Sequence, residues 1–114
     1  MDDAALLQTL RVRFNELMAV TMSRCIAEIH YHPAYVLRYM ADHDGVDTAE
    51  WLVSKPDETT GFTRLWEEGR LDLSAEALIL RPEFAPLFST DLRRTASDTL
   101  TAYQWKELAE IKRP

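Results

Sequence analysis

The first part of the chain contains no helix-breaking residue, and this feature constrains the fold more than any other. From Asp2 to Ile29 there is neither glycine nor proline, and apolar residues recur every three or four positions. This spacing places one apolar stripe along a single helix. The stripe consists of Leu7, Leu10, Phe14, Leu17, Met18, Met22, Cys25, Ile26 and Ile29. We therefore predict a long first helix, with Asp2 and Asp3 at its start, where acidic side chains favour the helix dipole.

The length of this helix sets a second constraint. At about 1.5 Å per residue it would run about 40 Å. A compact domain of about 100 residues has a radius of gyration of only about 13 Å. The first helix must therefore kink, fray at its start, or project beyond the core.

Shorter helices follow, and capping residues mark their ends. We predict helix starts at Pro33, Asp47, Ser74 and either Ser89 or Thr90, and helix stops at Gly45, Gly69 and Pro82. Proline suits a first turn, Ser and Asp cap N-termini, and glycine favours the left-handed position after a C-terminus. Residues 71–73 alternate as a strand does, but three residues do not make a sheet.

These boundaries predict an all-α fold. We expect a compact bundle of about six helices, with long first and last helices and four short ones between them. A length of 114 residues suits one domain. We assign residues 1–105 to a single helical domain and residues 106–114 to a polar C-terminal tail or a helix extension.

Composition argues against several functional classes. Thirteen Lys and Arg residues against nineteen Asp and Glu residues give a formal net charge of −6. Such a chain repels a phosphate backbone, so we expect no nucleic-acid partner. No run approaches the about 20 apolar residues of a membrane span, and the acidic start is unlike a signal peptide. A single cysteine, Cys25, fits a reducing compartment. We therefore expect a cytoplasmic protein without a membrane partner.

The stretch from Gly61 to Phe88 carries the most distinctive motif. It reads Gly-Phe-x-x-Leu-Trp-x-x-Gly-Arg-Leu-Asp-Leu-Ser-x-Glu-Ala-Leu, followed by Pro-Glu-Phe and Leu-Phe. This motif resembles a family of short bacterial proteins that have Thr at the position of Ser74 and tend to have Gly at that of Gln104. The resemblance covers roughly residues 14–105 and implies no activity, cofactor or catalytic residue. The change at Gln104 predicts that the last helix runs on past this position.

Histidines are the first candidates for chemistry. His30 and His32 form a His-x-His pair, and His43 follows between Asp42 and Asp44. Imidazole and carboxylate groups can bind zinc. However, a helix about 15 Å long would separate His32 from His43. We therefore expect no metal ion and no other cofactor, and we keep an enzyme or metal site that uses His32 and His43 as an alternative.

Tyrosines indicate a surface instead. Tyr31, Tyr35 and Tyr39 are spaced four residues apart, which places them on one helix face near Arg38. Apolar residues occupy the neighbouring face of the same helix, and a domain of this size cannot bury both. Tyrosine is favoured at interfaces because its ring is apolar and its hydroxyl is polar. The pattern predicts that Tyr35, Arg38 and Tyr39 contribute to a protein-binding surface.

Arg70 and Asp72 have two interpretations. They could pair or cap neighbouring helix ends, with support from Glu76, or they could form part of a recognition patch. The structural interpretation is favoured because Gly, Trp and Leu around polar caps are typical of a fixed turn.

The sequence as a whole shows no catalytic constellation, so we predict that the protein is not an enzyme. The leading hypothesis is a helical protein–protein interaction or regulatory module. Its exposed helix surface would contact a protein partner or a second copy of the chain, through Tyr35, Arg38, Tyr39, Arg70 and Asp72. The alternative is a small acidic inhibitor or mimic that occupies a basic surface of its partner.

Overall fold

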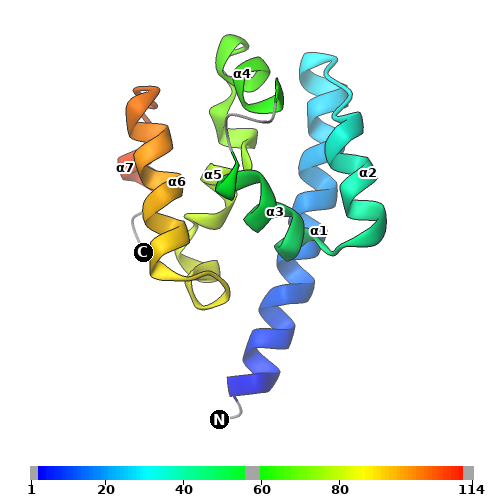
Figure 1. Ribbon diagram of the computed structural model, residues 1–114, viewed down its shortest axis with the longest axis vertical. Coiled ribbons are helices and arrows are strands. Elements are labelled where there is room, and N and C mark those ends of the chain that lie inside the picture. The colour runs from blue at the N-terminus through cyan, green and yellow to red at the C-terminus, as the bar shows by residue number, and fades with distance from the viewer. Residues whose placement is uncertain (1–2, 56–59, 112–114) are drawn as a thin grey trace.

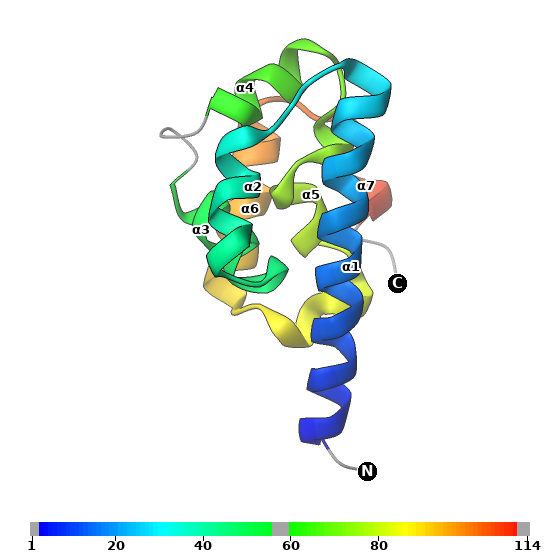
Figure 2. The same cartoon turned by 90° about the vertical axis from the view of Figure 1, so that its right-hand side faces the viewer.

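The first helix, α1, is the longest element of the protein. The computed structural model describes residues 3–55 and 60–111, and in it α1 runs from Asp3 to Ile29 as one helix of 27 residues. Residues 3–9 are all exposed, and this end extends beyond the other helices (Figures 1 and 2). Of the three outcomes expected for an over-long helix, projection is the one observed. The predicted N-terminal position of Asp2 lies outside the described residues.

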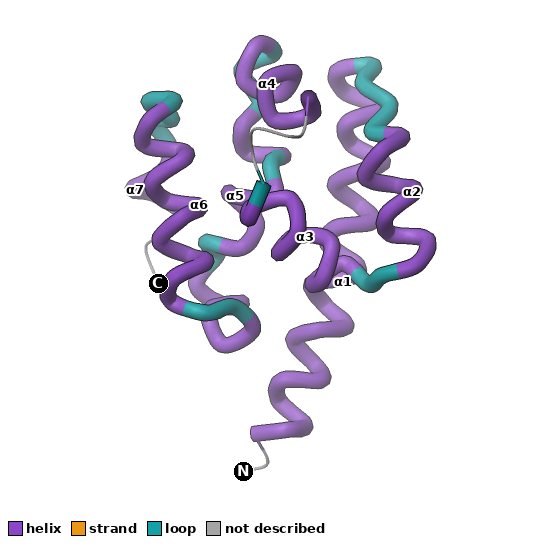
Figure 3. Tube along the Cα trace, viewed as in Figure 1, coloured by secondary structure: helices purple, strands orange, loops and turns teal. Residues whose placement is uncertain are grey.

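The other secondary-structure elements of the described residues are also helices, as Figure 3 shows, and this confirms the predicted all-α bundle. The α-helices are α2 (Ala34–Asp42), α3 (Gly45–Ser54), α4 (Thr60–Glu67), α5 (Ala75–Ile79), α6 (Thr90–Ala102) and α7 (Leu108–Ile111). Two 3-10 helices, η2 (Leu71–Leu73) and η3 (Pro82–Leu87), connect them. None of the described helices is both long and apolar enough to cross a membrane. Residues 56–59, between α3 and α4, lie outside the described residues.

The short helix α5 lies at the centre of the core. All five of its residues are buried, and it packs against α3, α6 and η2 (Figure 1). A helix that is covered on every side needs apolar residues on every side, and α5 reads Ala-Glu-Ala-Leu-Ile. Its one polar residue, Glu76, is therefore a charged side chain among apolar ones.

Several of the predicted helix ends are confirmed. Ser74 caps α5 by accepting a hydrogen bond from the backbone N–H of Ala77 at 3.2 Å, and Ser89 caps α6 by accepting one from Leu92. Gly69 follows α4 with a left-handed φ of 70°. The backbone N–H of Arg70 then donates to the Leu65 carbonyl, which completes the C-terminal cap.

Three predicted helix ends are wrong. Gly45 does not stop α2 but begins α3, whose N-cap is Asp44 rather than Asp47. The last long helix does not run past Gln104, because α6 ends at Ala102 and Gln104 takes a left-handed φ of 58°. Gln104 thus occupies a conformation that glycine adopts more easily.

A close crossing of α1 and α3 explains the glycine at position 45. A Cβ atom there would lie 2.9 Å from the backbone Cα of Asn15. The Asn15 side chain accepts a hydrogen bond from the Val46 N–H at 3.2 Å. Arg11 adds ion pairs from α1 to Asp44 and Asp47, at 2.5 and 2.9 Å. This polar contact fixes how the first turn of α3 sits on α1.

Replacing Gly45 with alanine should therefore destabilise the protein. The added methyl group meets backbone atoms that cannot move independently, so we expect the free energy of unfolding to fall by about 1–3 kcal/mol. Urea unfolding followed by circular dichroism measures this loss. Gly61→Ala is the matched control, because there the new methyl group would meet the end of the Tyr31 side chain rather than backbone. An equal loss in both variants would contradict the close-crossing explanation.

Replacing Gln104 with glycine should have the opposite effect. Removing a side chain from a left-handed residue relieves strain, and we expect a net gain of about 1 kcal/mol in the free energy of unfolding. The same urea experiment measures it. Thr101→Gly, within α6, should lower stability instead, since glycine is a poor helix former. A destabilised Gln104→Gly variant would show that the left-handed residue carries no strain.

Candidate functional site

Four aromatic rings form a continuous stack along α2 and α3. Trp51 of α3 lies between Tyr35 and Tyr39 of α2, with ring centroids 5.5 Å from Tyr35 and 4.2 Å from Tyr39. His43, which follows α2, stacks on the other side of Tyr39 at 3.9 Å. The planes of Tyr39 and Trp51 are within 3° of parallel. Each such pair stabilises the arrangement by about 0.5–1.5 kcal/mol beyond the area it buries.

This ring stack, defined as Tyr35, Trp51, Tyr39 and His43, lies on the solvent side of α2 and α3. Arg38 and Asp42 line a shallow hollow together with the four rings. Tyr35 is 63% exposed, while Tyr39 and Trp51 are half-buried. The structure therefore brings the predicted surface residues Tyr35, Arg38 and Tyr39 together. Sequence periodicity did not predict that Trp51 and His43 would join them.

Tyr31 does not join the other tyrosines, so the prediction of a three-tyrosine face is wrong. It lies before α2, and its hydroxyl group packs above Gly61 of α4. A helix begins only after Pro33, so spacing by four carries no information across that boundary.

The histidines are not gathered into a metal site. Within the described part of the chain, no group of three His, Cys, Asp or Glu side chains is placed to hold a metal ion. His43 is committed to the ring stack, and its Nδ1 atom lies 3.0 Å from the Tyr39 carbonyl oxygen. His30 and His32 are exposed in the connection between α1 and α2.

Arg70 and Asp72 pair with each other at η2. Two hydrogen bonds of 3.0 and 3.2 Å join the guanidinium to the carboxylate. A further ion pair of 2.9 Å joins Arg70 to Glu28 of α1, which Arg24 also binds. Hydrogen bonds from Arg24 and then Arg70 lower the pKa of Glu28. These contacts tie η2 to α1, and Glu76 is not among the groups that Arg70 binds.

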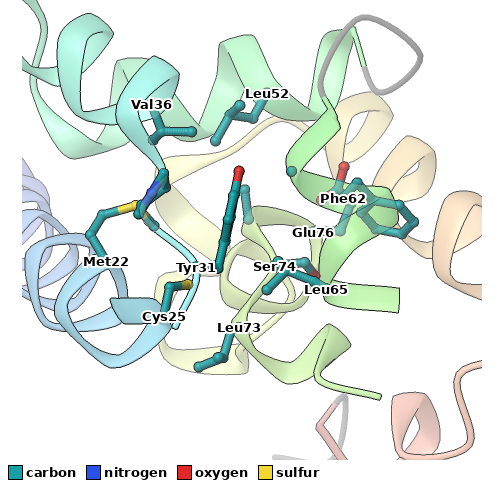
Figure 4. Close-up of a pocket in the computed structure, with 13 residues that line it drawn as sticks. Met22, Cys25, Tyr31, Val36, Leu52, Phe62, Leu65, Leu73, Ser74 and Glu76 are labelled. Carbon is teal, nitrogen blue, oxygen red and sulfur yellow. The ribbon is translucent and has the colours of Figure 1, made fainter. Parts of the chain in front are cut away.

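A cavity of about 50 Å³ lies on the inner side of α2 and α3, the helices that carry the ring stack (Figure 4). Tyr31 stands in its middle, between side chains of α1 and those of α4 and α5. Most of the lining is apolar, including Met22, Val36 and Leu52. Cys25 also lines the cavity and is 1% exposed, as expected for a thiol on the apolar stripe. Burial raises the pKa of both the Cys25 thiol and the Tyr31 hydroxyl.

Glu76 is the unexpected member of this lining. Its side chain belongs to the central helix α5, and the residue is only 3% exposed. Within the described residues it forms no salt bridge, and its own backbone N–H supplies its hydrogen bond. Burial raises the pKa of Glu76 to about 7. The sequence offered one signal, a single acid within the apolar run from Ala75 to Leu80.

Comparison with known proteins adds no family and no activity. No protein-family model matches the chain, and no curated protein or solved structure gives a significant match. Function is therefore inferred from the residues themselves.

The buried Glu76 predicts a pH-dependent stability. Its folded-state pKa of about 7 lies above the ordinary value of 4.5, so the folded protein binds the extra proton. Below pH 4.5 Glu76 is protonated in both states and does not affect the free energy of unfolding. As pH rises from 4.5 toward 7, Glu76 lowers the free energy of unfolding progressively, and above pH 7 the loss stays at about 3 kcal/mol. Urea unfolding of the wild type and Glu76→Gln, on both sides of this pH window, measures the effect. Glu76→Gln should lose this pH dependence, and an unchanged pH profile in the variant would contradict the assignment.

Proposed function

We propose that the protein is a non-enzymatic protein–protein interaction module that binds its partner through the outer face of α2 and α3. The observation that carries this proposal is the ring stack with Tyr35 at its exposed end. Large rigid rings give much contact area for little loss of side-chain entropy on binding. Tyrosine and tryptophan are accordingly enriched among the residues that dominate binding energy.

The stack is preorganised within the protein, which supports a role in recognition. Trp51 is fixed between two parallel or nearly parallel rings, and Tyr39 is fixed between Trp51 and His43. The inner rings, Tyr39 and Trp51, are half-buried, whereas Tyr35 remains 63% exposed. A preorganised surface binds more tightly because less conformational freedom is lost.

The net charge of the chain favours a basic partner. The hollow itself is bordered by one base and one acid, Arg38 and Asp42, and Asp47 of α3 is already paired with Arg11. The whole chain carries a formal net charge of −6. Complementary potentials speed association and exclude partners of the wrong sign. We therefore infer a protein partner whose contact surface carries Lys or Arg residues, which also accommodates the alternative role of an acidic inhibitor.

Comparative affinity capture from the native host tests the proposal. Wild type, Tyr35→Ala and Trp66→Ala serve as baits, and the captured proteins are quantified by mass spectrometry. Trp66 is the matched control, because it is a 49% exposed aromatic residue on α4, outside the ring stack. A specific partner should bind the wild type and Trp66→Ala but not Tyr35→Ala.

The purified partner then allows a quantitative test. Removing a dominant interface residue should weaken binding by about 30-fold or more, and calorimetry measures it. Binding should also weaken as salt rises if charge complementarity contributes. Equal affinity of Tyr35→Ala and wild type would refute the assigned surface. Sedimentation of the chain alone shows whether the partner is a second copy of the chain or a different protein. A homodimer through this face should dissociate in the Tyr35→Ala variant.

A further inference from the structure

The cavity beside Glu76 combines an apolar lining with one buried acid. A carboxylate can accept about four hydrogen bonds, whereas the Glu76 side chain receives one from its own backbone. The nearby Ser74 hydroxyl is already used, since it donates to the Leu71 carbonyl and accepts from the Ala77 N–H. Among the described residues that line the cavity, none is basic. The acid is thus placed in an apolar space without a cation.

We propose that this cavity binds a short primary alkylammonium ion, with its ammonium group against the Glu76 carboxylate and its alkyl chain against Val36, Leu52 and Leu65. These three side chains come from α2, α3 and α4, and they line the same cavity as Glu76 (Figure 4). Such a ligand supplies both missing elements, a positive charge for the acid and apolar atoms for the remaining space.

Charge selects a cation over other small ligands. A negative ligand would face the Glu76 carboxylate in a low-dielectric interior, where repulsion is strong. A neutral alcohol could form a hydrogen bond, but charge-assisted hydrogen bonds are roughly twice as strong. The other ionisable side chains of the lining are Cys25 and Tyr31, and burial favours the uncharged form of both. They leave Glu76 as the charged group that the ligand meets.

Cavity size limits the alkyl chain. About 10–15 Å³ of such space holds one water-sized atom, so a cavity of about 50 Å³ accepts about four non-hydrogen atoms. Propylammonium has this size. The affinity that the best small ligands reach for their size corresponds, for four non-hydrogen atoms, to a Kd of about 40 µM or weaker. This site is separate from the ring stack, and the proposal does not depend on the proposed protein partner.

Amide NMR of the isotopically labelled full chain tests the proposal. The protein is titrated with propylammonium chloride at a pH of about 8, where the alkylamine is still protonated. Sodium chloride at equal concentration controls for ionic strength, and 1-propanol is the neutral ligand of the same size. We expect saturable shifts at cavity residues, binding about tenfold tighter than that of 1-propanol, and ligand-to-protein Overhauser contacts to Val36, Leu52 and Leu65.

Glu76→Gln separates charge from shape. This variant keeps the size of the side chain and removes a buried charge, so it should fold. It should bind propylammonium no better than 1-propanol, while its 1-propanol affinity stays close to that of the wild type. The proposal is overturned if the wild type binds both ligands equally, if Glu76→Gln keeps the preference for the cation, or if no saturable shift occurs at the cavity.

Discussion

Burial of α5 is the interaction on which the rest of the structure depends. A helix of five residues is far below the length of about 12 residues at which isolated helices become even marginally stable. Its stability therefore comes from the elements around it, with α3, α6 and η2 in direct contact. The Ser74 cap satisfies its N-terminus locally. The longer helices form a shell around a core element that could not exist without them.

Polar contacts determine how that shell is arranged. Interdigitated apolar side chains resist displacement, and paired charges and hydrogen bonds add specific partners. Arg11 and Asn15 join α1 to the first turn of α3, and Arg70 joins η2 to Glu28 near the other end of α1. Burial opposes ionisation of Asp44, but the Asp47 N–H and Arg11 outweigh it and lower its pKa. These two polar anchors place the helices that carry both candidate sites.

The pair of helices α2 and α3 contributes to the two sites from opposite sides. Outward, Tyr35, Tyr39 and Trp51 form the ring stack proposed to bind a protein. Inward, Val36 and Leu52 line the cavity proposed to bind a small cation. A ligand in the cavity would therefore contact the same two helices that present the aromatic surface. This arrangement gives one structural unit two chemically distinct faces, one an exposed aromatic stack and the other part of a mostly apolar cavity wall.

Local signals in the sequence determined the helical class, the long first helix and the caps at Ser74 and Ser89, because periodicity and capping act within a few residues. They also predicted that Tyr35, Arg38 and Tyr39 share one surface, and the structure places the three around one hollow. They did not identify Trp51 as the ring between two tyrosines, because that contact joins separate helices. The predicted helix stop at Gly45 is wrong because this glycine is required by the close crossing with Asn15 of α1 and not by a local turn. The burial of Glu76 was likewise decided by tertiary structure alone, since only the packing of other helices removes a carboxylate from water.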